Sequence, residues 1–104
     1  MRTVKYEEIL YERLRDSKYA AAYLAEVLAN ESYSTFLIAL RDIMEARTEG
    51  ITSLAEETGL TRQALHRIMS INGNPRLSTL NELLKALGLK ITITTLNKGF
   101  PDGM

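Results

Sequence analysis

The stretch from Ile51 to Ser70, ITSLAEETGLTRQALHRIMS, constrains the fold more than any other part of the sequence. Two short runs with apolar residues at helical spacing flank Gly59, and glycine adopts a left-handed turn without steric cost. Ala55 lies four residues before this glycine, where a steeply crossing second helix needs a small neighbour. The expected inward positions are all apolar: Leu54, Leu60, Leu65 and Ile68. The pattern predicts a helix-turn-helix, a pair of helices suited to the DNA major groove.

The outward face of the second helix carries side-chain types that read base edges. Arginine pairs bidentately with guanine and glutamine with adenine, and the small Ala64 keeps the helix slim. We expect base contacts from Thr61, Arg62, Gln63, His66 and Arg67, of which Thr61 and Arg67 could equally contact phosphate. The competing interpretation is an ordinary helical hairpin whose polar residues form a solvated face.

Phosphate contacts are expected on either side of that helix. Thr52 and Ser53 are predicted at a helix N-terminus, where free amides and the helix dipole attract anions. The loop NGNPR can present backbone amides, and its Arg76 adds charge. The candidate phosphate-contacting residues are Thr52, Ser53, Asn72, Asn74 and Arg76.

Charge is distributed unevenly along the chain. Lys plus Arg and Asp plus Glu each number 13, a formal net charge of zero that argues weakly against strong polyanion binding. However, the 24 residues between Glu57 and Glu82 contain no acidic side chain. A local basic face is therefore compatible with a neutral protein.

The N-terminal half predicts three helices. Apolar residues at helical spacing indicate helices over residues 6–16, over 18–30 with Ser17 as N-cap, and over a third span ending near Arg47. Ser32 or Ser34 is expected to cap this third helix, with Met44 in its core stripe. The second helix is expected to bury one apolar face that includes Leu28.

Further helices are expected in the C-terminal half. Thr52 or Ser53 is predicted to open a helix, with Ser53 and Glu56 at the spacing of a capping box. Thr61 is expected to cap a helix running to about Ser70. After the loop signal NGNP, Ser78 is predicted to cap a leucine-rich helix that ends at Gly88.

The segment KITITTL, residues 90–96, has the alternating β-branched pattern of a strand. A lone strand leaves its backbone hydrogen-bonding groups unpaired, and the sequence offers no second strand. We therefore expect Ile91 and Ile93 to belong to an intermolecular pairing strand, with a symmetry mate or another protein. A solvated C-terminal arm is the alternative.

The fold class expected is mainly α, a small helical bundle with a lambda-repressor-like helix-turn-helix and one C-terminal β-strand. Residues 1–49 are expected to pack on a DNA-binding region at 50–89, followed by the strand at 90–96 and a flexible tail at 97–104. We expect these parts to form one compact domain, because 104 residues is a typical length for a single domain.

Composition excludes several function classes. With no cysteine and a single histidine, thiolate metal sites, cysteine nucleophiles and most catalytic constellations are absent. The Asp42 and Glu45 carboxylates share a helical face but are expected to be a solvated pair. We expect no enzyme activity, metal or cofactor, no membrane association, and a cytoplasmic location.

Three stretches carry a resemblance to a known family: AAAYLAEVLA, FLIALRDIMEAR, and ITSLAEETGLTRQALHRIMSINGNPRLSTLNELLKALGLKITI. Over about residues 10–95 the chain resembles addiction-module antidote proteins, the HigA-like antitoxins with a Cro/repressor-type helix-turn-helix. The resemblance implies a dimeric antitoxin that binds a RelE/ParE-like toxin and represses its own operon at a palindromic operator on double-stranded DNA. It also places Thr61, Arg62, Gln63, His66 and Arg67 in the recognition helix, and residues 72–76 in the following loop.

Two other functions remain open at this point. The first is a stand-alone helix-turn-helix regulator without a toxin partner. The second is a protein-interaction module whose helix-turn-helix does not read DNA, which the zero net charge permits.

Overall fold

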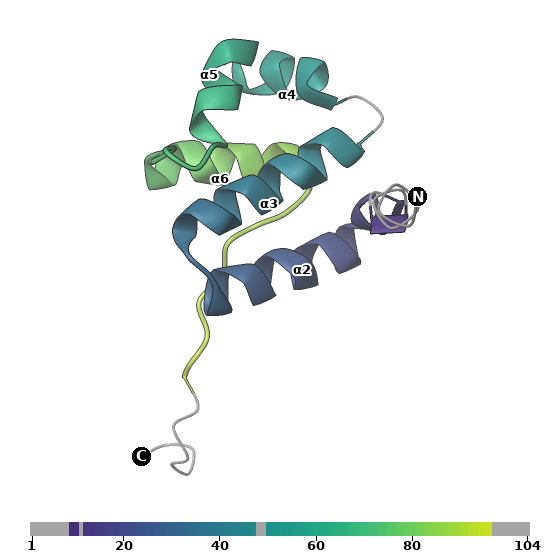
Figure 1. The fold of residues 1–104 in the computed structure, drawn as a ribbon, viewed down its shortest axis with the longest axis vertical. Coiled ribbons are helices and arrows are strands. Elements are labelled where there is room, and N and C mark those ends of the chain that lie inside the picture. The colour runs from purple at the N-terminus through teal and green to yellow at the C-terminus, as the bar shows by residue number, and fades with distance from the viewer. Residues whose placement is uncertain (1–8, 11, 48–49, 97–104) are drawn as a thin grey trace.

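The computed structural model describes residues 9–10, 12–47 and 50–96 (Figure 1). Within them lie five complete helices: α2 Ser17–Asn30, α3 Tyr33–Ala46, α4 Gly50–Thr58, α5 Arg62–Ile68 and α6 Leu77–Ala86. Residues 9–10 and 12–14 are also helical. The described part of the chain is thus a helical bundle, as the apolar spacing predicts. The flexible tail expected at 97–104 lies outside the described residues.

Helix α3 is the centre of the bundle. It packs against α2 on one side and α4 on the other, and α4 also packs against α5 and α6. Figure 1 shows α4 and α5 at one end of the molecule and α2 at the opposite end. The α4–α5 pair therefore stands on a scaffold that keeps it away from α2.

The core between these helices is apolar. Among the described residues, no polar or charged side chain is buried. The largest fully buried side chains are Leu14, Leu37, Leu40, Ile43, Met44, Leu65, Met69 and Leu83. Leu54 is also buried, and Leu60 and Ile68 pack against the cluster from partly buried positions, as their expected inward orientation requires.

Several helix ends follow the sequence signals. Ser32 is the N-cap of α3, where its hydroxyl accepts a hydrogen bond from the Thr35 amide at 3.1 Å. Gly88 follows α6 with φ of 80°. The Gly88 amide donates to the Lys85 carbonyl at 2.9 Å and the Leu89 amide to the Leu84 carbonyl at 2.8 Å, the Schellman pattern that satisfies end carbonyls.

Other helix starts differ from the predictions. Asp16, not Ser17, caps α2, because the Asp16 carboxylate accepts from the Lys18 amide at 2.9 Å and Ser17 is already helical. Helix α6 begins at Leu77, and its first turn closes when the Leu80 amide donates to the Arg76 carbonyl. Ser78 is therefore inside the first turn and is not the cap.

Helix α4 also starts earlier than predicted. It begins at Gly50, whose φ of 63° a residue with a side chain rarely adopts. Thr52 and Ser53 consequently lie within the first turn. The predicted capping box of Ser53 and Glu56 was wrong, since a capping residue must precede the helix.

Three long-range hydrogen bonds fix the ends of these helices to one another. The Ser34 hydroxyl donates to the Ile71 carbonyl at 2.8 Å, and Arg47 Nη2 donates to the Leu87 carbonyl at 3.1 Å. Arg15 Nε donates to the Ala46 carbonyl at 2.8 Å. These bonds hold α3 to the loop after α5, to the end of α6 and to the segment before α2.

The predicted strand is not present in the single chain. Residues 89–96 carry neither helix nor sheet, and the segment leaves the bundle as an open trace (Figure 1). A strand exists only when a neighbour supplies the other half of the hydrogen-bond ladder. The described residues contain no second strand to do so. Pairing with another chain therefore remains a prediction.

Candidate nucleic-acid interface

The turn between α4 and α5 is built by short-range hydrogen bonds. The Gly59 amide donates to the Ala55 carbonyl at 2.9 Å, and Gly59 has φ of 76°. The Thr58 hydroxyl donates to the Leu54 carbonyl at 2.8 Å and accepts from the Leu60 amide at 3.3 Å. Hydrogen bonds therefore fix the turn on both sides of Gly59, the position predicted for it from the sequence.

Thr61 begins the second helix. Its hydroxyl accepts a hydrogen bond from the Ala64 amide at 3.0 Å, which confirms it as the N-cap. Helix α5 crosses α4 steeply in Figure 1 and ends at Ile68, two residues earlier than predicted. Its seven residues stand at the edge of the bundle.

Helix α5 has one buried and one exposed side. Leu65 and the following Met69 are fully buried, and Ala64 and Ile68 are half-buried. The five predicted base-contacting side chains are all exposed: Thr61, Arg62, Gln63, His66 and Arg67. The structure therefore brings these five residues together on one short helix and its cap.

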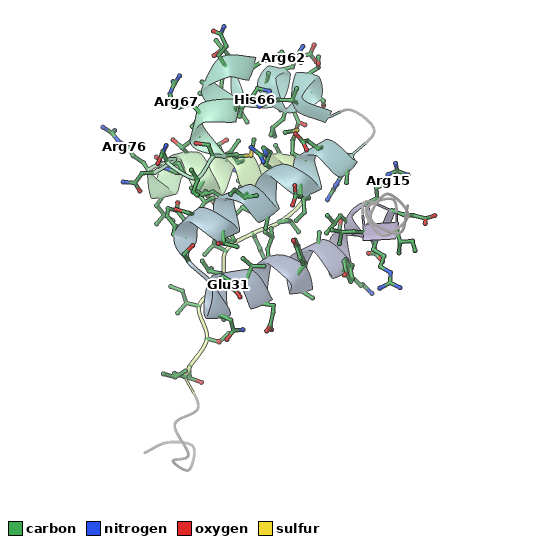
Figure 2. The ribbon with its side chains drawn as sticks, viewed as in Figure 1. Arg15, Glu31, Arg62, His66, Arg67 and Arg76 are labelled. Carbon is green, nitrogen blue, oxygen red and sulfur yellow. The ribbon has the colours of Figure 1, made fainter. Side chains whose placement is uncertain are left out.

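The predicted phosphate-contacting residues lie on the first turn of α4 and in the loop between α5 and α6. Thr52, Asn72, Asn74 and Arg76 are exposed, and Ser53 is half-buried. In Figure 2, the labelled Arg62, His66, Arg67 and Arg76 all lie on the α5 end of the molecule, whereas Arg15 and Glu31 lie elsewhere. We call the five residues on α5 and its cap, with Arg76, the basic face.

The loop after α5 depends on a close backbone approach. The Gly73 amide donates to the Ser70 carbonyl at 2.9 Å, and a Cβ at Gly73 would collide with the Ile68 carbonyl oxygen. The loop can therefore close against the end of α5 only with glycine at this position. Arg76 follows directly and leads into α6.

Asp42 and Glu45 lie apart from the basic face, on α3. Burial raises the pKa of Asp42, Glu45 raises it further, and Arg41 acts in the opposite direction. Asp42 is half-buried and Glu45 is exposed, so the expectation of a solvated carboxylate pair was wrong for Asp42. No group of three or more potential metal ligands occurs among the described residues.

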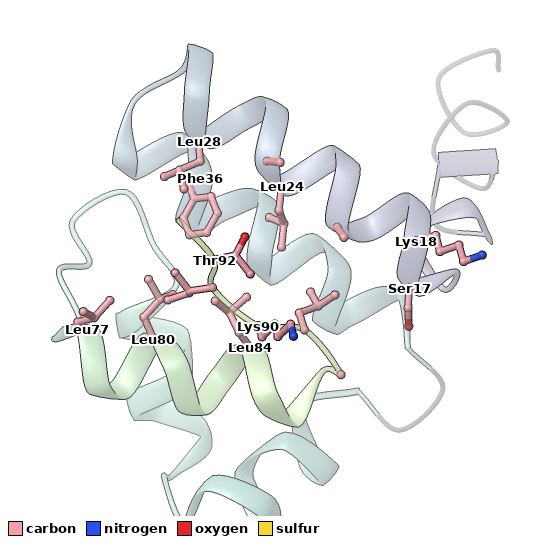
Figure 3. Close-up of a pocket in the computed structure, with 15 residues that line it drawn as sticks. Ser17, Lys18, Leu24, Leu28, Phe36, Leu77, Leu80, Leu84, Lys90 and Thr92 are labelled. Carbon is pink, nitrogen blue, oxygen red and sulfur yellow. The ribbon is translucent and has the colours of Figure 1, made fainter. Parts of the chain in front are cut away.

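A second surface feature is an apolar groove on the side of α2. It has a volume of about 630 Å³ and lies between α2, α6 and the segment after Gly88 (Figure 3). Its apolar lining includes Leu24, Leu28, Phe36, Leu77, Leu80, Leu84 and Ile91, and its charged residues are Lys18 and Lys90. We call it the α2–α6 groove.

The apolar periodicity of the sequence does not predict this groove. Leu28, expected on the buried face of its helix, is 56% exposed, and Leu77 is 70% exposed. The available signal was Leu77 itself, an apolar residue in the first turn of its helix that shares a face with Leu80 and Leu84. In addition, no helix among the described residues is long and apolar enough to cross a bilayer.

The chain is thus a small helical protein with an apolar core, and one short helix, α5, carries exposed polar and basic side chains at its surface. Residues 5–95 match the family model described as "Probable addiction module antidote protein", and the chain belongs to this family. An uncharacterized protein of Haemophilus influenzae is 32% identical over 82 residues, which cover 79% of this chain and 82% of the relative. No solved structure matches this chain significantly.

Proposed function

We propose that this protein is an antitoxin that neutralises a RelE/ParE-like toxin and represses its own operon by binding a palindromic operator. The observation that carries the proposal is the basic face on α5, in a chain that belongs to the antidote family. Membership of that family indicates an antitoxin role and, in general, a toxin partner. The DNA part of the proposal rests on the α4–α5 pair.

The α4–α5 pair acts as a helix-turn-helix in this proposal. Helix α5 enters the major groove with its N-terminal residues toward the bases. Arg62 suits a bidentate contact to guanine and Gln63 one to adenine, because both side chains are exposed at the start of the helix. His66 and Arg67 follow one turn later, and Thr61 precedes them.

Backbone phosphates set the position of this helix in the groove. Arg76 supplies a charged contact on the far side of the loop, and Asn72 and Asn74 supply polar ones. At the other end, Thr52 and Ser53 lie in the first turn of α4, where helical amides and the dipole favour an anion. Such contacts fix register and leave the choice of sequence to α5.

A homodimer completes the proposal. Two copies of α5 would read half-sites about 34 Å apart, one turn of the double helix, so the operator would be a palindrome. The zero net charge is compatible with this arrangement, since only the basic face has to approach the phosphates.

The test combines two measurements on the full chain. The tagged protein is recovered from its native host, co-purifying proteins are identified, and its affinity for the DNA upstream of its own gene is measured. Specific promoter binding, together with a stoichiometric partner whose RNA cleavage the protein blocks, is the expected result. Promoter binding without a protein partner would instead indicate a stand-alone regulator. A protein partner without promoter binding would indicate an interaction module.

A further inference from the structure

The C-terminal segment, residues 90–96, is the most exposed apolar part of the described chain. Ile93 is 94% exposed, Leu96 76% and Ile91 43%. Among the described residues, no backbone hydrogen bond joins residues 90–96 to another segment. An extended segment with free amides and carbonyls and apolar side chains is an edge that another strand can complete.

We propose that the strand that completes it is the same segment of a second copy of this chain, running antiparallel, with the twofold axis at Ile93. The inference rests on the homodimer of the proposed function and adds its surface and register. From the sequence alone, the second strand could come from a symmetry mate or from another protein. In this proposal it comes from a symmetry mate.

The proposed register places Ile93, the most exposed of the large apolar side chains described, at the twofold axis. In an antiparallel pair centred on Ile93, residue 91 faces 95 of the second copy and 92 faces 94. One face of the ribbon then collects Ile91 and Ile93 from both copies, with Thr95 at its ends. The opposite face pairs Thr92 with Thr94, a favourable cross-strand pair. A shift by one residue would mix isoleucine with threonine on both faces.

Charge favours the same arrangement. Lys90 is the only charged residue of the segment, and in this register it faces Leu96 of the second copy. A parallel pair in register would instead place Lys90 directly beside the second Lys90, and like charges opposite each other destabilise a sheet. Charge therefore favours the antiparallel pair over a parallel pair in register.

The α2–α6 groove supplies the support that such a ribbon needs. A two-stranded ribbon alone is marginal in water, and packing against helices stabilises it. Ile91 and Thr92 line the same groove as the exposed Leu28 and Leu77. Figure 3 labels Thr92, Leu28 and Leu77 around it. The groove lies on the α2 side, whereas α5 lies toward the other end of the bundle (Figure 1), so a ribbon packed there would leave α5 itself uncovered.

Engineered cysteines test the register directly, because the natural chain contains none. At the twofold axis the two Cα atoms of residue 93 would be about 4.5 or 5.5 Å apart, and disulfides span roughly 4.4–6.8 Å. The matched control is Thr95→Cys, exposed and on the same ribbon face, whose two copies would be offset by roughly 13 Å. In a glutathione redox buffer, full-length Ile93→Cys should form at least roughly tenfold more covalent dimer than Thr95→Cys.

A second variant measures assembly without any cross-link. Ile93→Asp places two carboxylates at the axis, and sedimentation should shift from dimer to monomer while the helical circular dichroism is unchanged. Because Ile93 is 94% exposed, this substitution does not disturb the core. A wild type that sediments only as monomer, or equal cross-linking of the two cysteine variants, overturns the proposal.

The outcome is separable from that of the proposed function. Promoter binding with a monomeric wild type removes this interface and leaves the repressor function in place. Efficient cross-linking through residue 93 without promoter binding supports this interface and removes the repressor function. If residues 90–96 gain amide-exchange protection only when the co-purified protein partner is added, the segment belongs to that partner and the proposal fails.

Discussion

The hydroxyl of Ser34 donates a hydrogen bond to the carbonyl oxygen of Ile71 at 2.8 Å. The two residues are 37 positions apart, so this bond ties the first turn of α3 to the loop that follows α5. The next residues of that loop lead to Gly73 and Arg76. The bond therefore fixes the loop that carries Arg76, at one end of the basic face, to the central helix α3.

Ser34→Ala removes this bond without changing the core. We expect a loss of about 1 kcal/mol or less in the free energy of unfolding, because the Ile71 carbonyl can be hydrated in its place. Urea unfolding measures the change. Ser78→Ala, an exposed serine that does not cap its helix, is the matched control and should leave stability unchanged. Equal effects of the two substitutions would assign no role to the Ser34 bond.

Gly73→Ala tests the close approach within the same loop. The added Cβ collides with the Ile68 carbonyl oxygen, so the backbone must move, and we expect a destabilisation of about 1–3 kcal/mol. Thermal or urea unfolding gives the value. Gly88→Ala is a useful comparison because its added methyl meets open space and only the left-handed φ is penalised. If Gly73→Ala were neutral, the loop would not pack as described.

Arg62→Ala tests the proposed reading of bases. Because the Arg62 side chain is exposed, stability should hold while operator affinity falls by about 1–3 kcal/mol. Sequence preference at one base pair of each half-site should relax at the same time. Fluorescence anisotropy with matched and substituted DNA measures both. Arg13→Ala, an exposed arginine near the start of the chain, is the control for lost charge. An unchanged operator affinity would move the reading helix elsewhere.

Arg76→Ala should behave differently from Arg62→Ala. As a phosphate contact, it should weaken binding to all DNA sequences similarly and reduce the salt dependence by about one charge per protomer. Anisotropy titrations over a range of salt concentrations give the slope. A change in sequence preference without a change in slope would reassign Arg76 to base contact.

Asp42→Asn tests the effect of burying a carboxyl on α3. Burial, with Glu45 adding to it, raises the folded-state pKa of Asp42 above its ordinary value of 3.8, so the folded protein binds this proton more tightly than the unfolded chain. The contribution of Asp42 to stability is therefore present below pH 3.8 and is lost as the pH rises through the folded-state pKa. The stability of Asp42→Asn relative to wild type should rise across this window and then level off. Unfolding curves at several pH values, with Glu56→Gln at an exposed position of α4 as control, measure the difference.

Much of the fold follows from local patterns. The inward Leu54 and Leu65, the caps Ser32 and Thr61, and the turns at Gly59 and Gly88 all lie where the sequence places them. Each of these features depends on residues within about one helical turn, so a short stretch carries enough information to specify it. The exposure of the five candidate base-contacting residues follows in the same way, from the opposite side of one apolar stripe.

Other features required the packed chain. Asp16 rather than Ser17 caps α2, and α4 and α6 begin at Gly50 and Leu77, because neighbouring signals compete and the surrounding structure selects one. The α2–α6 groove exists because tertiary packing leaves Leu28 and Leu77 exposed, which the periodicity of a single helix cannot reveal. For residues 90–96 even one folded chain is insufficient, since the hydrogen bonds that define a strand require a second strand. Local order is thus encoded within each helix, whereas helix boundaries and surface grooves arise only when the helices meet.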